Sequence, residues 1–109
     1  SRTKRCDGMI VELIGQEKVL LQEAGFARSG RGMLAYWYPA NLLEPWKVRP
    51  LSMKIPTPEG ATIEEPVLID PLSQQICKMS NVKKTDGGLV CEQLPLKDYP
   101  MIVSDAAIL

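Results

Sequence analysis

The stretch Met33-Leu34-Ala35-Tyr36-Trp37-Tyr38-Pro39 is an unbroken run of apolar and aromatic side chains that ends in proline. Successive side chains of a β-strand point to opposite faces, so residues 34, 36 and 38 share one face and residues 33, 35 and 37 the other. Both faces are apolar or aromatic, which is typical of a central strand. We therefore predict a central strand that buries Trp37 and that ends at Pro39, because proline cannot continue a sheet ladder.

Short apolar runs of the same kind recur along the rest of the chain. They occupy residues 46–55, 66–70, 75–79, 89–94 and 101–104, and segments rich in proline, glycine, aspartate and asparagine separate them. Strands of this length at such regular spacing are typical of a sandwich or barrel. The sequence therefore predicts an all-β fold, a single small antiparallel β-sandwich or barrel of about six to eight strands, formed by residues 1–109 as one domain.

The N-terminal part of the chain allows two interpretations. Residues 7–26 could form a helix that Asp7 caps, or a hairpin with strands Met9–Ile14 and Lys18–Gln22. The strands expected downstream favour the hairpin, and a short N-terminal helix is the alternative. Residues 1–8 are basic and polar, and we expect them to be a frayed terminus.

Composition restricts the classes of function. The 109 residues carry 13 basic and 13 acidic side chains, so the net charge is zero and neither nucleic acid nor a membrane surface is an expected partner. The chain has no histidine, the commonest general base and metal ligand. We therefore expect no enzyme activity from this chain alone, no cofactor and no metal site. The compartment is not indicated.

Three cysteines, Cys6, Cys77 and Cys91, are too few and too scattered for a zinc site without histidine. One interpretation is three free thiols. The other is a pair between Cys77 and Cys91, because these positions are symmetric about the polar loop expected at Ser80–Gly88. A hairpin folded about that loop would bring the two side chains opposite each other on neighbouring strands.

Acidic and aromatic residues offer two further candidates for function. Glu64 and Glu65 are the only adjacent acidic pair, but neighbours on a strand face opposite ways and cannot flank one glycosidic bond. No catalytic residues are therefore predicted. The aromatic residues Tyr36, Trp37, Tyr38 and Trp46 could form a platform that stacks on sugar rings, or they could serve as core and docking residues.

Three segments together resemble a known kind of domain. They are Leu34–Pro39, Pro66–Ser73 and Leu94–Val103, and the resemblance spans about 70 of the 109 residues. The pattern is similar to the small β-sandwich that follows the catalytic (β/α)8 barrel in many glycoside hydrolases. Gln74 departs from that pattern, in which glycine is usual in the turn after the second segment. We expect Asp70 to accept backbone N–H bonds across this turn.

The resemblance implies a non-catalytic accessory domain that packs on, or shapes, the catalytic domain of a glycoside hydrolase. The barrel and its catalytic glutamates are absent from this sequence, so hydrolase activity does not carry over to it. The expected partner is a catalytic domain or another protein, with carbohydrate as a further possibility. The alternative is a self-standing module that binds carbohydrate or protein.

Overall fold

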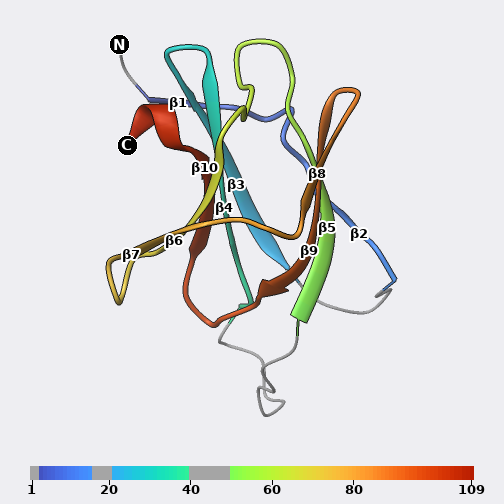
Figure 1. The fold of residues 1–109 in the computed structure, drawn as a ribbon, viewed down its shortest axis with the longest axis vertical. Coiled ribbons are helices and arrows are strands. Elements are labelled where there is room, and N and C mark those ends of the chain that lie inside the picture. Colours follow the sequence, from blue (N-terminus) through green and yellow to red (C-terminus); the bar gives the residue numbers. More distant parts are fainter. Residues whose placement is uncertain (1–2, 16–20, 40–49) are drawn as a thin grey trace.

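The computed structural model describes residues 3–15, 21–39 and 50–109 and is all-β (Figure 1). Within these residues, ten strands form two antiparallel sheets. In sheet order, the six-stranded sheet consists of β1 (Lys4–Arg5), β3 (Gln22–Arg28), β4 (Arg31–Trp37), β10 (Met101–Asp105), β6 (Pro66–Asp70) and β7 (Gln75–Lys78). The four-stranded sheet consists of β2 (Glu12–Leu13), β5 (Pro50–Pro56), β9 (Gly88–Pro95) and β8 (Val82–Thr85). A short 3-10 helix, Ala106–Ile108, follows β10.

The two sheets pack face to face around one hydrophobic core, which confirms the prediction of an all-β, sandwich-like fold. Strand β4 lies between β3 and β10, so the prediction of a central strand at residues 33–38 is also confirmed. Its residues Leu34 and Tyr36 are completely buried against the inner side chains of the four-stranded sheet, which are Leu51, Met53 and Ile55 of β5 and Leu89, Cys91 and Leu94 of β9.

A buried hydroxyl group ties the two sheets together. Tyr36 of β4 donates a hydrogen bond from its O–H to the carbonyl oxygen of Pro95, at the end of β9, over 2.8 Å. Burial raises the pKa of Tyr36 well above its usual value, so the phenol keeps its proton and remains a donor. The bond satisfies a polar atom that would otherwise be buried without a partner.

The N-terminal segment differs from both interpretations of residues 7–26. The described residues contain no α-helix, and the proposed hairpin partners belong to different sheets. Glu12–Leu13 pairs with β5, whereas Gln22 begins β3, which pairs with β1 and β4. Leu13 thereby lies opposite Met53 on the buried side. Local periodicity cannot reveal this pairing, because Met53 is distant in the sequence. Residues 16–20 lie outside the described residues.

Two further expectations are corrected in the same way. Lys4–Arg5, within the terminus expected to be frayed, forms β1 against Ala27 and Phe26. The segment expected as a polar loop, Ser80–Gly88, contains strand β8, which forms a hairpin with β9. This hairpin turns at Asp86-Gly87, and Gly87 has a positive φ of 78°, which glycine adopts without strain.

The Tyr36 hydrogen bond gives a stability test. Tyr36→Phe leaves the Pro95 carbonyl without this donor and should lower the free energy of unfolding by about 1–2 kcal/mol. Urea unfolding followed by circular dichroism measures the loss. Tyr99→Phe, which removes a hydroxyl from a less buried site, is the control and should cost less. Equal stability of Tyr36→Phe and the parent chain would contradict this role.

Candidate functional site

The outer face of the six-stranded sheet, which points away from the four-stranded sheet, is unusually apolar. Register places five side chains in one line across five adjacent strands. This apolar row consists of Ala24, Ala35, Ile102, Ile69 and Ile76. Next to it, Phe26, Met33 and Val67 lie in a second line across the same face, with Ser104 between Met33 and Val67.

The described residues form no third sheet and no α-helix that could make a second layer over this outer face. The two described sheets pack against each other through their inner faces. Ala24, Val67 and Ser104 on this face are buried, Ala35, Ile102 and Ile69 are half-buried, and Ile76 on the edge strand is 56% exposed. A row of aliphatic side chains across a sheet face is normally buried against another layer.

The outer face of the four-stranded sheet provides the contrast. Glu12 lies opposite Lys54 there, and Lys83 lies opposite Val90. Ser52 faces the same way because its neighbours Leu51 and Met53 are buried, and Thr85 does so because it alternates with Lys84, which pairs with the buried Leu89. This sheet therefore shows the usual pattern of apolar residues inside and polar residues outside, which the six-stranded sheet lacks.

The four aromatic candidates do not form a single platform. Tyr36 is completely buried and Tyr38 is 9% exposed, so both belong to the core. Trp37, expected to be buried, is instead half-buried on the outer face, opposite Gln22. The expectation failed because the second apolar face of β4 has no covering layer within the described residues. Trp46 lies outside the described residues.

The hairpin of β6 and β7 carries Ile69 and Ile76 at one side of the outer face (Figure 1). As expected, Asp70 closes its turn by accepting backbone N–H bonds from Leu72 at 3.0 Å and Ser73 at 3.4 Å. Its other oxygen accepts a hydrogen bond from the Tyr99 hydroxyl at 3.0 Å. Gln74, at the position where glycine was expected, has a positive φ of 60°.

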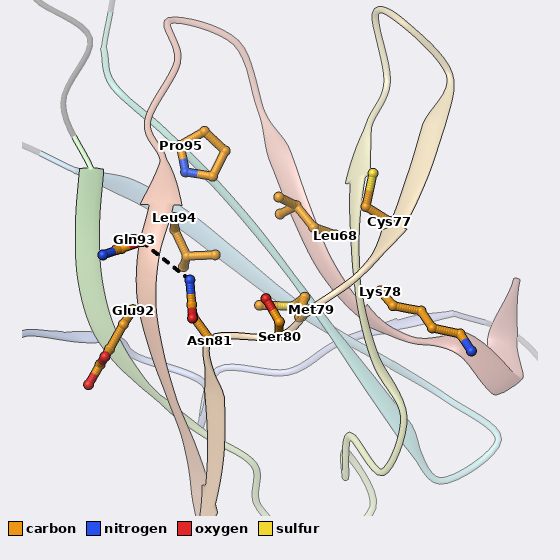
Figure 2. Close-up of a pocket in the computed structure, with 10 residues that line it drawn as sticks. All are labelled: Leu68, Cys77, Lys78, Met79, Ser80, Asn81, Glu92, Gln93, Leu94 and Pro95. Atoms are coloured by element: carbon orange, nitrogen blue, oxygen red, sulfur yellow. Dashed lines mark hydrogen bonds between the residues drawn. The ribbon is translucent and has the colours of Figure 1, made fainter.

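A small cleft opens where residues 79–81 pass from β7 to β8 (Figure 2). Its volume is about 150 Å³, below the roughly 300–1,000 Å³ of typical ligand pockets. Leu68, Met79 and Leu94 supply its apolar lining. Gln93 lies on a bulge of β9 with a φ of 57°, and its side-chain oxygen accepts a hydrogen bond from Asn81 Nδ2 at 3.3 Å.

The cysteines show that the predicted pairing of Cys77 with Cys91 is wrong. Cys77 lies on β7 opposite Leu68, whereas Cys91 lies on β9 between Met53 and Val82, in the other sheet. The cause is strand β8, because the chain changes sheets before it folds back on β9. All three cysteines are free, and burial raises the pKa of the Cys91 thiol to about 11.

One ionic cluster was not anticipated from the sequence. Asp105 is 1% exposed, and it accepts backbone N–H bonds from Glu64 at 2.8 Å and Ala107 at 2.9 Å. Arg31 Nη1 lies 3.7 Å from Asp105 and 3.6 Å from Glu64, whose other oxygen is 3.5 Å from Lys84 Nζ. The cluster joins four segments that are distant in sequence. Its two acidic and two basic side chains are paired with one another.

The residues of the apolar row were also missed as a site, although the sequence contained a signal. Residues 33–37, 67–69 and 101–103 are apolar at consecutive positions, a pattern that we interpreted only as strands, central in the case of residues 33–38. Cross-strand register brings these second faces together, and register between strands distant in sequence cannot be obtained from periodicity.

Comparisons with protein-family models, with curated proteins and with solved structures find no significant match to this chain. In the part of the chain that the structure describes, no helix is long and apolar enough to cross a membrane. Among the same residues, no group of three or more cysteine and acidic side chains could hold a metal ion.

The thiols provide a test of the sheet assignment. Cys77 should react with an aromatic disulfide reagent in the native protein, because it is exposed. Cys91 should react only after unfolding, because it is fully buried and its thiolate is disfavoured. Peptide mapping after timed labelling measures the reaction rate of each thiol, with Cys77→Ser as the control. Equal native reactivity of the two thiols would contradict this assignment.

The Asp70 turn gives a prediction on pH. Although desolvation raises the pKa of Asp70, the hydrogen bonds from Tyr99, Ser73 and Leu72 outweigh it and lower the pKa. A lowered folded pKa means that Asp70 stabilises the protein above its unfolded pKa of about 3.9. That stability is lost as the pH falls through the lower folded value.

Asp70→Ala should therefore lower the melting temperature at about pH 7, and the difference from the parent chain should shrink toward about pH 2. Thermal unfolding across this range measures the effect. Tyr99→Phe removes one of the donors and should reproduce part of it. A difference that grows as the pH falls would contradict the assignment.

Proposed function

We propose that this chain is a non-catalytic β-sandwich domain that docks on a partner protein domain through the outer face of its six-stranded sheet. The observation that carries the proposal is the apolar row, which crosses five strands without a covering layer in the described residues. A contiguous apolar sheet face that is left partly accessible in this way is typical of an interaction site.

The geometry favours a protein partner over a sugar. Sugar binding on a flat surface requires exposed aromatic rings, but Tyr36 and Tyr38 lie in the core. The outer face instead presents small and branched aliphatic side chains, such as Ala35, Ile102 and Ile69, that interdigitate well with another layer of secondary structure. Trp37 and Met33 are residue types enriched at protein interfaces.

The resemblance to accessory domains of glycoside hydrolases suggests which partner to test first. In that arrangement, the sandwich stabilises or shapes a catalytic barrel, and its own residues perform no bond chemistry. Three of the five strands that form the row, β4, β6 and β10, carry the resemblance. We accordingly propose the catalytic domain of a glycoside hydrolase as the partner.

The experiment begins with the coding sequence next to this chain in its gene. A folded domain encoded in the same reading frame is produced separately, and its affinity for the chain is measured by calorimetry. Ile76→Asp should weaken binding at least tenfold, which corresponds to about 1.4 kcal/mol, because a charge would be buried at the interface. Ile76 lies on an edge strand and is 56% exposed, so the variant should fold.

Ile10→Asp is the matched control, because Ile10 is 68% exposed and lies outside both sheets. It should bind like the parent chain. The absence of any neighbouring domain in the reading frame would contradict the proposal. So would equal affinities of Ile76→Asp and Ile10→Asp.

A further inference from the structure

The outer face of the six-stranded sheet is asymmetric in charge as well as apolar. Register places four charged strand residues at positions of this face, and all four are basic: Arg5, Arg28, Arg31 and Lys78. The guanidinium of Arg31 turns back to Asp105 and Glu64, so it does not stay on the face. The acidic residues of the same sheet, Glu23, Asp70 and Asp105, fall on the alternate positions. Because the whole chain has no net charge, this separation is local.

The basic groups lie at the border of the apolar surface. Arg5 and Lys78 end the line that runs through Phe26, Met33, Ser104 and Val67. These two residues are on the first and last of six strands, which places them about 24 Å apart at a strand spacing of about 4.8 Å. Arg28 lies at the end of β3, and its side chain is exposed.

The basic residues differ in whether they already have ionic partners within the chain. Arg31 is held by Glu64 and Asp105. Arg5 stacks over the Phe26 ring, 5.6 Å from its centroid, and makes an ion pair of 3.8 Å with Asp7, which is 94% exposed. A pair so exposed contributes little, so Arg5 can exchange Asp7 for a partner's carboxylate. Arg28 and Lys78 are exposed as well.

We propose that the docking partner presents an apolar surface bordered by acidic side chains, placed to meet Arg5, Arg28 and Lys78. This inference rests on the proposed function, because it concerns the same outer face. Interfaces of this kind bury an apolar centre and pair opposite charges around the rim, which sets orientation and speeds association.

The same charges disfavour a second copy of this chain as the partner. In a two-fold symmetric dimer, each surface meets itself. If the two-fold axis runs along the strands, Arg5 of one copy would face Lys78 of the other. If the axis runs across the strands, Arg5 would face Arg5 and Lys78 would face Lys78. Like charges placed opposite each other across an interface cost affinity.

An anionic membrane would also suit an apolar surface with basic residues, but the shape favours a protein. The row lies in the middle of a sheet, and its central members Ala35, Ile102 and Ile69 are half-buried between neighbouring strands. Such a surface fits side chains of another layer. Insertion into lipid instead depends on protruding apolar side chains.

Two dyes that differ in charge test the inference on the 109-residue chain. Anilinonaphthalene sulfonate is apolar and anionic, whereas Nile red is apolar and neutral. The double variant Arg28→Glu/Lys78→Glu should weaken sulfonate-dye binding at least fivefold and leave Nile red binding unchanged. Raising the salt concentration should weaken only the anionic dye. Lys83→Glu, on the outer face of the four-stranded sheet, is the control and should affect neither dye.

The outcomes separate this inference from the proposed function. If Ile76→Asp weakens both dyes but the double variant weakens neither, the apolar docking face stands and the acidic partner is overturned. If Ile76→Asp affects neither dye, the docking face itself fails. Sedimentation that shows a dimer abolished by Ile76→Asp would instead identify a second copy as the occupant. Flotation with phosphatidylserine vesicles that is lost in the double variant would identify a membrane. Either result overturns the acidic protein partner.

Discussion

The structure depends on the burial of one face of β4 against β5 and β9. Leu34 and Tyr36 are the central side chains of that contact, and Tyr36 also closes the sandwich by its hydrogen bond to Pro95. Each fully buried side chain of this size contributes roughly 1.5–3 kcal/mol. Once this face is fixed, the alternation of the strand fixes the direction of every other side chain on β4.

That constraint explains why the outer face exists. The residues that alternate with Leu34 and Tyr36 are Met33, Ala35 and Trp37, and they must point away from the four-stranded sheet. Antiparallel pairing with β10, and through it with β6, adds Ile102 and Ile69 on the same side. A sheet facing only water would carry polar residues there, as the four-stranded sheet does with Glu12 and Lys54.

Sequence reasoning succeeded where the information is local. The alternation at residues 33–38 predicted a central strand, and the Asp70 turn followed from side-chain chemistry. It failed where distant segments decide the outcome. Leu13 pairs with Met53 rather than forming a hairpin, and β8 separates Cys77 from Cys91. The candidate site was missed for the same reason, because its residues meet only through register between strands.

The central claim is that the outer face is covered by another domain when this chain acts. Hydroxyl-radical footprinting measures this directly, because Met33 and Trp37 lie on that face and both side chains oxidise readily. Met79, beside the cleft, serves as the internal reference. Between the isolated chain and its complex with the neighbouring domain, we expect oxidation of Met33 and Trp37 to fall severalfold while Met79 stays unchanged. Unchanged oxidation of Met33 and Trp37 in the complex would contradict the account.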